Sequence, residues 1–119
     1  MHSKGYIVIV EPDELLQELL ERWLGGAGYE VISSKDRIPP RVLPELVIAD
    51  ISDPASAGDA VEALQTAYAA PILALSARFR RGLGASREAA QRLRVRKVLP
   101  KPFTREELLV AVREVVELP

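Results

Sequence analysis

Side chains that can handle a phosphoryl group stand directly after short apolar runs of this sequence. The carboxylates, the hydroxyl and the ammonium belong to Glu11, Asp13, Asp50, Ser76 and Lys101. Crowded carboxylates repel one another and favour a divalent cation, and oxygen ligands of this kind suit Mg²⁺. An ammonium and a hydroxyl beside them could hold phosphoryl oxygens through charge-assisted hydrogen bonds. If these residues meet in space, the chemistry that they support is phosphoryl binding or transfer beside a cation.

The apolar runs before these residues have the pattern of buried strands, and helical patterns separate them. The expected strands cover residues 6–10, 29–33, 46–49, 71–75 and 95–99. The expected helices cover residues 15–24, 58–68, 86–93 and a last segment that begins at 104. Strands that are apolar throughout are buried on both faces, which indicates a parallel sheet covered by helices. The predicted fold class is therefore α/β, a (βα)5 three-layer sandwich, and ligands bind such sheets beyond the carboxyl ends of the strands.

Prolines and capping residues indicate where these elements begin and end. Three prolines among residues 36–44 predict that the second helix is shortened or missing, because proline inside a helix costs about 3 kcal/mol. Pro12 suits the first turn of the first helix, where its missing N–H costs nothing. Thr104 and Glu107 form a capping box at the start of the last helix. The pattern thus consists of four regular βα units and one irregular unit.

Length and composition exclude several classes of protein. The 119 residues contain no cysteine, which excludes disulfide scaffolds, cysteine-ligated metal sites and thiol catalysis. We expect one domain over residues 1–119, because a chain of this length builds a single core. No apolar run approaches the roughly 18 residues of a membrane span, and the N-terminus lacks the plan of a signal peptide. We therefore expect a cytoplasmic protein with no membrane contact.

The net charge of −1 hides an uneven distribution of charge along the chain. Residues 78–101 carry nine basic side chains and one acid, Glu88, in an otherwise acidic sequence. A solvated face is the default explanation for such a run. We do not expect this domain alone to bind nucleic acid, because no helix-turn-helix pattern or interleaved aromatic residues accompany the charge. An acidic protein partner is the alternative that the charge favours.

Over essentially its whole length, the chain resembles the receiver domain of bacterial two-component response regulators. The matching residues are Asp50 with Pro54 and Gly58, Ser76 with Ala77, and Lys101 with Pro102 and Phe103. The resemblance implies a flavodoxin-like fold with strand order 2-1-3-4-5. It also implies a cis peptide bond between Lys101 and Pro102.

The resemblance assigns a role to each of these positions. It implies that Asp50 is the phosphoacceptor, that Ser76 is a switch hydroxyl and that Lys101 pairs with Asp50 or the phosphoryl oxygens. Glu11, Asp50 and the backbone carbonyl of Ser52 would then ligate Mg²⁺. Such a domain is not an enzyme beyond self-catalysed phosphotransfer and dephosphorylation.

The resemblance also implies the kinds of partner. A sensor histidine kinase or a phosphotransfer protein would donate the phosphoryl group. An effector would bind the face formed by the helix near 86–93, the strand at 95–99 and the last helix, and a homodimer is also compatible with the resemblance. The cognate kinase, the output and the extent of any longer chain do not follow from the sequence.

Two departures from the family pattern affect the site. The family usually has two adjacent acids after the first strand, where this chain has Glu11 and Pro12. Pro12 has no side-chain oxygen, so the Mg²⁺ site is expected to be weakened or lost, unless Glu11 or Asp13 reaches the ion. Val98 stands where an aromatic switch residue is usual, which weakens the coupling of hydroxyl movement to aromatic rotation.

Other interpretations of the same residues were weighed. A pseudo-receiver would use the same fold as a phosphorylation-independent binding module, with Lys101 only an ion-pair partner of Asp50. A flavodoxin needs a hydroxyl- and glycine-rich phosphate loop after the first strand, and the acids around Pro12 would repel a phosphate. A haloacid-dehalogenase-type phosphatase needs a second acid two residues after the nucleophile, where this chain has Ser52.

Overall fold

The structure is a computed structural model, and it describes residues 4–34, 44–51, 57–76, 90–91 and 94–117. Its strands are β1 (Lys4–Val10), β2 (Tyr29–Ser33), β3 (Leu46–Asp50), β4 (Ile72–Ser76) and β5 (Lys97–Pro100). Its helices are α1 (Glu14–Gly26), α2 (Ala57–Tyr68) and α4 (Arg105–Glu117). No helix in these ranges is long and apolar enough to span a bilayer.

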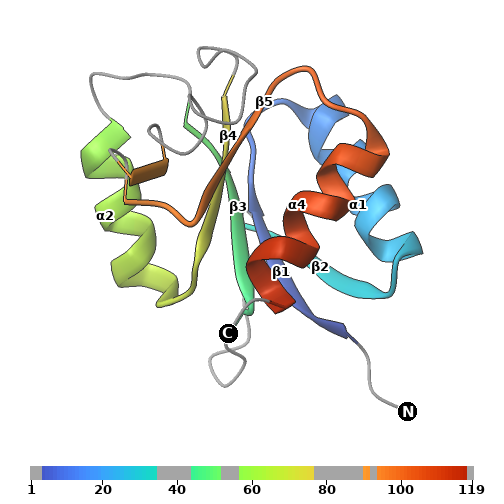
Figure 1. The fold of residues 1–119 in the computed structure, drawn as a ribbon, viewed down its shortest axis with the longest axis horizontal. Coiled ribbons are helices and arrows are strands. Elements are labelled where there is room, and N and C mark those ends of the chain that lie inside the picture. The colour runs from blue at the N-terminus through green and yellow to red at the C-terminus, as the bar shows by residue number, and fades with distance from the viewer. Residues whose placement is uncertain (1–3, 35–43, 52–56, 77–89, 92–93, 118–119) are drawn as a thin grey trace.

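The five strands form one parallel sheet with the order β2-β1-β3-β4-β5 (Figure 1). The expected 2-1-3-4-5 order is therefore confirmed. Helices α1 and α4 cover one face of the sheet and α2 covers the other, which gives three layers (Figure 1). The curtailed second helix was expected within residues 36–44, and all but Pro44 of that segment lies outside the described residues.

Successive residues of the central strands point into two different cores. Ile7 and Ile9 of β1 pack beneath α1 and α4, whereas Val8 faces α2. This alternation is the two-residue period of a strand. It explains why the runs are apolar at every position, since both faces are covered. Burial of this kind is worth about 1.5–3 kcal/mol for each large apolar side chain, so the two cores hold the strand ends in place.

The boundaries of two elements differ from the prediction. The last strand begins at Lys97 rather than at residue 95, because Arg94 has a positive φ of 60° and ends a turn. The Val95 N–H donates to the Ala90 carbonyl at 3.0 Å, so residue 95 belongs to that turn and not to the sheet. Only Ala90 and Gln91 of the helix expected at 86–93 lie among the described helical residues.

The predicted start of the first helix also needs correction. Pro12 lies outside the helix, which begins at Glu14 with Asp13 as its N-cap. Leu15 is 80% exposed although it shares the helical spacing of the buried leucines. The capping box was predicted correctly: the Glu107 N–H donates to Thr104 Oγ1 at 3.1 Å, and the Thr104 N–H donates to Glu107 Oε1 at 2.9 Å.

One buried hydroxyl stands out in the core. Tyr6 of β1 is 5% exposed, and its Oη has no hydrogen-bond partner within the ranges that the structure describes. Burial, and to a smaller extent the negative charge of Glu30, raises the pKa of Tyr6 above its ordinary value. A hydroxyl that loses water without gaining a partner costs about 1–3 kcal/mol.

We predict that Tyr6→Phe stabilises the protein by about 1 kcal/mol, because it removes the unpaired hydroxyl and keeps the ring. Urea unfolding followed by circular dichroism measures the change. Tyr68→Phe on the half-buried face of α2 is the control, and we expect it to change stability by less than about 0.5 kcal/mol. A loss of stability in Tyr6→Phe would mean that the hydroxyl has a partner.

Candidate functional site

Four of the residues expected to share a site follow or end neighbouring strands. Glu11 follows β1, Asp50 ends β3, Ser76 ends β4, and Lys101 follows β5. All four strands are parallel, so these ends lie at one edge of the sheet. The four side chains therefore lie at the edge of the sheet that the sequence predicted.

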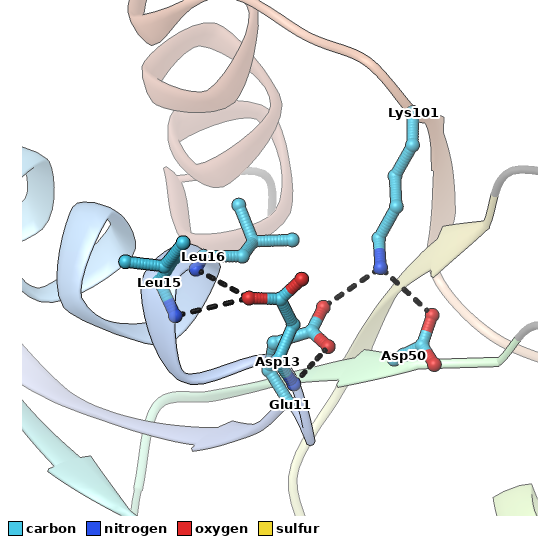
Figure 2. Close-up of polar contacts among 6 residues, drawn as sticks. All are labelled: Glu11, Asp13, Leu15, Leu16, Asp50 and Lys101. Carbon is cyan, nitrogen blue, oxygen red and sulfur yellow. Dashed lines mark hydrogen bonds and ion pairs between the residues drawn. The ribbon is translucent and has the colours of Figure 1, made fainter.

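The ammonium of Lys101 lies between two carboxylates (Figure 2). Its Nζ donates to Glu11 Oε1 at 2.8 Å and to Asp50 Oδ1 at 3.0 Å. The three side chains come from three different strand ends, separated by as many as 90 positions in the sequence. Their convergence was predicted, while their proposed roles stay predictions.

The three charged groups are enclosed to different degrees. The side chain of Glu11 is 1% exposed, that of Asp50 is 15% exposed and that of Lys101 is 20% exposed. A charge as enclosed as that of Glu11 needs a partner and hydrogen bonds. Lys101 supplies the opposite charge, and the Asp13 N–H donates to Glu11 Oε2 at 3.1 Å. Asp50, by contrast, keeps contact with solvent at the rim.

The pKa of Lys101 is raised above its ordinary value. Burial alone would lower it, since burial disfavours the charged form, but the hydrogen bonds and charges of Glu11 and Asp50 outweigh that effect. Lys101 is therefore an ammonium at neutral pH. Its charge offsets part of the repulsion between the two carboxylates.

Ser76 is fully buried at the end of β4. Its backbone carbonyl accepts a hydrogen bond from the Lys101 N–H at 2.9 Å, which ties the start of the Lys101 loop to β4. The next peptide bond, Lys101–Pro102, is cis, as predicted. Val98, at the usual aromatic position, is 1% exposed and packs in the α2-side core.

Asp13 serves the helix rather than the site. Its Oδ1 accepts from the N–H groups of Leu15 and Leu16 at 2.9 and 3.1 Å, and the side chain lies at the surface (Figure 2). These are the unpaired amides that an N-cap satisfies. The sequence signal for this role was present, since an aspartate precedes the helical leucines.

We predict that Asp13→Ala destabilises the protein by about 1 kcal/mol, whereas Asp13→Asn keeps most of the stability because asparagine also caps helices. Thermal unfolding of both variants checks this prediction. Glu14→Ala, which removes an exposed first-turn acid without removing the cap, is the control, and we expect it to lose about 0.3 kcal/mol. An Asp13→Asn variant as unstable as Asp13→Ala would contradict the capping role.

The described residues do not fit a Mg²⁺ ion well. No group of three or more His, Cys, Asp or Glu side chains able to hold a metal occurs among them. Glu11 and Asp50 both bind Lys101, Pro12 has no side-chain oxygen, and Asp13 caps α1. Ser52, whose carbonyl was the third expected ligand, lies outside the described residues. Mg²⁺ is usually held by one or two carboxylates with water completing its octahedron, and here the ammonium of Lys101 already occupies both carboxylates.

An apolar hollow beside Lys101 was not predicted. It has a volume of about 430 Å³ and is lined by Leu16, Leu19, Trp23, Lys101, Pro102 and Phe103. Trp23 and Phe103 meet edge to face, with 6.5 Å between the ring centroids. Trp23 has the helical spacing of a core residue but is only half-buried. The ring nevertheless packs against the α1–α4 core.

Sequence comparison finds one curated relative and no matching family model. The relative is the protein PetR of Rhodobacter capsulatus, which is 31% identical over 96% of this chain. The chain spans about half the length of that protein, 49%.

Solved structures with a similar fold are numerous, and two are informative here. The non-phosphorylated HemR receiver domain of Leptospira biflexa is 27% identical, with a TM-score of 0.74 over 98% of this chain and 97% of that one. The receiver domain of a Pseudomonas aeruginosa sensor histidine kinase, with a magnesium ion coordinated in its active-site cleft, is 24% identical. It has a TM-score of 0.73 over 98% of this chain and 100% of that one.

Proposed function

Because this chain is a receiver domain of the response-regulator type, we propose that it serves two-component signalling by accepting a phosphoryl group on Asp50. The observation that carries the proposal is the contact of Lys101 Nζ with Asp50 Oδ1 at 3.0 Å. Asp50 is the partly exposed carboxylate of the site, so a phosphodonor can reach it, whereas Glu11 is enclosed.

The proposed step is an in-line displacement at phosphorus. A carboxylate oxygen of Asp50 attacks the phosphorus of a phosphohistidine on a sensor histidine kinase or phosphotransfer protein. An O–P bond forms, the N–P bond breaks, and its electron pair returns to the imidazole nitrogen. The Lys101 ammonium stabilises the negative charge on the phosphoryl oxygens, which is the main demand of this chemistry. The protein is a stoichiometric acceptor in this scheme, not an enzyme with a substrate of its own.

Ser76 and the neighbouring surface would transmit the modification. The Ser76 hydroxyl would donate a hydrogen bond to a phosphoryl oxygen, since β4 ends next to β3 and β5. The effector would bind the face of β5 and α4, where Lys97 pairs with Glu114 and the large apolar side chain of Val110 is exposed.

The basic residues beside this face would favour an acidic effector. Arg96 is exposed just before β5, while Arg92 lies outside the described residues. We expect charge reversal at Arg92 and Arg96 to weaken binding of an acidic effector, because it replaces electrostatic attraction by repulsion.

We also propose that phosphorylation depends weakly on Mg²⁺ or not at all. The support is the donor set: Glu11 and Asp50 are bound to Lys101, and Pro12 adds no ligand. A divalent cation would therefore have to compete with the Lys101 ammonium for both carboxylates.

A phosphorylation assay on the 119-residue chain tests the function. The protein is incubated with acetyl phosphate, and intact-mass and peptide mass spectrometry locate any phosphoryl group. We expect one group on Asp50, and amide NMR shifts around Asp50, Ser76 and Lys101 on addition of beryllofluoride. Absence of both responses, with and without Mg²⁺, would reject the proposal.

The second candidate function is a phosphorylation-independent binding module. It is favoured by the same ion pairs, because a closed Glu11–Lys101–Asp50 set is already satisfied without a phosphoryl group. Replacing Asp50 by alanine in the chromosomal gene separates the two functions. Loss of the signalling response supports the phosphoacceptor, and an unchanged response supports the binding module.

A further inference from the structure

Glu11 is the most enclosed acid in the part of the chain that the structure describes. Among those residues, it is the only charged residue that is buried. Both carboxylate oxygens are engaged: Oε1 accepts from Lys101 Nζ at 2.8 Å, and Oε2 accepts from the Asp13 N–H at 3.1 Å. Asp13 is the N-cap of α1, so the helix fixes the position of its backbone amide. The hydrogen bond from that amide holds the Glu11 carboxylate in one orientation.

That orientation aims Glu11 at Lys101. The lysine side chain is long and has many rotamers, and the ion pair at Glu11 restricts it to the conformation that also reaches Asp50 (Figure 2). Asp50 lies at the rim and is more exposed than Glu11. The more enclosed contact is therefore the stronger restraint on the position of the ammonium.

The two residues that follow Glu11 in the sequence, both within the described part of the chain, do not complete a cation site with it. Pro12 has neither a side-chain oxygen nor an N–H, and its position is exposed. Asp13 uses its carboxylate for the amides of α1. A metal ion that used Glu11 would have to displace Lys101 and leave the ammonium to find another partner.

We infer that Glu11 is a positioning residue that fixes the Lys101 ammonium beside Asp50, and that this ammonium replaces a divalent cation as the resident positive charge of the site. The effect of Glu11 on phosphoryl transfer rests on the proposed function. The effect on metal binding does not, because that depends on the ion pairs of Glu11 and Asp50 with Lys101 and on the missing side-chain oxygen at Pro12.

A Mg²⁺ titration of the full chain tests the metal-binding part. Trp23 is the single tryptophan, and it lines the same hollow as Lys101, so its fluorescence reports on the site. Amide NMR shifts of Asp50 and Lys101 give a second readout. The variants are the native chain, Pro12→Asp, which adds a carboxylate at an exposed position, and the control Glu14→Gln.

We expect no saturable change with millimolar Mg²⁺ in the native chain or in Glu14→Gln, and a saturable change in Pro12→Asp. Saturable binding by the native chain with the affinity of Pro12→Asp would overturn the inference. Failure of Pro12→Asp to bind, in a variant shown to be folded by circular dichroism, would also count against it, because the missing ligand would not be the reason.

The rate of labelling by acetyl phosphate tests the positioning part. We expect Glu11→Gln to label about 10-fold more slowly than the native chain, as for loss of a supporting residue, and Glu11→Asp to recover part of the rate. EDTA should leave the native rate unchanged and lower the rate of Pro12→Asp. A Glu11→Gln rate equal to the native rate would reject the positioning role. If no variant is labelled, the proposed function fails, and the Mg²⁺ titration still decides whether Lys101 is the resident cation.

Discussion

Replacing Asp50 by asparagine is expected to abolish incorporation of a phosphoryl group from acetyl phosphate. The amide oxygen of asparagine carries no negative charge and is a poor nucleophile, so the O–P bond does not form. The fold should persist, because Lys101 keeps its partner Glu11 and asparagine can still accept a hydrogen bond from the ammonium. Intact-mass spectrometry measures the loss, and thermal unfolding shows whether the variant is folded.

Asp59→Asn is the matched control for this experiment. Asp59 is an exposed acid in the first turn of α2, so the same chemical change there should leave labelling intact. Labelling that persists in Asp50→Asn and disappears in Asp59→Asn would place the acceptor outside the site. Labelling that persists in both would mean that a different side chain takes the phosphoryl group.

Replacing Lys101 by methionine is expected to lower the free energy of unfolding by about 3–5 kcal/mol, the cost of leaving a buried charge without its partner. Methionine has a similar length but no charge, so packing changes little. The Glu11 carboxylate, 1% exposed, would keep only the Asp13 N–H and would face Asp50 without an intervening cation. Urea unfolding followed by circular dichroism gives the change.

Lys97→Met is the control, because Lys97 also pairs with an acid but at the surface. The side chains of Lys97 and Glu114 are 32% and 48% exposed, and exposed pairs contribute about 0–1 kcal/mol. A double variant, Glu11→Gln with Lys101→Met, should recover much of the loss because it no longer contains a buried unpaired charge. An effect of Lys101→Met as small as that of Lys97→Met would show that Glu11 does not depend on the ion pair.

Much of the fold follows from local patterns. Runs such as residues 46–49 are apolar at every position. This pattern is typical of a strand whose two faces are both covered. Thr104 and Glu107 marked the start of α4 because a capping box involves only neighbours in the sequence. Predictions that depended on adjacent residues alone were therefore correct for most elements.

The predictions from the sequence failed where contacts with other parts of the fold determine the structure. Residues 95 and 96 continue an apolar and basic run, but the turn at Arg94 delays the start of β5 to Lys97. Leu15 matches the helical spacing of the buried leucines, yet it is 80% exposed. Spacing indicates which residues share a face, and it does not show how far the neighbouring layer extends.

The candidate site was also predictable only in part. The order of the strands and the residues at their ends were enough to predict that Glu11, Asp50 and Lys101 meet, because parallel strands end at one edge of the sheet. The degree of burial was not predictable from residue type, since Glu11 and Asp50 are both acids that follow apolar strands. Glu11 is 1% exposed and contacts the Asp13 N–H at the N-cap of α1, whereas Asp50 is 15% exposed.

Residue types and short-range spacing were thus sufficient for the class of fold and for the set of groups at the sheet edge. The structure showed which partner each group has. Asp13 caps α1, and Lys101 lies between the carboxylates of Glu11 and Asp50, which are distant from it in the sequence. The physical reason is that hydrogen-bond partners and desolvation are set by which surfaces come together. Those surfaces here belong to segments as far as 90 residues apart.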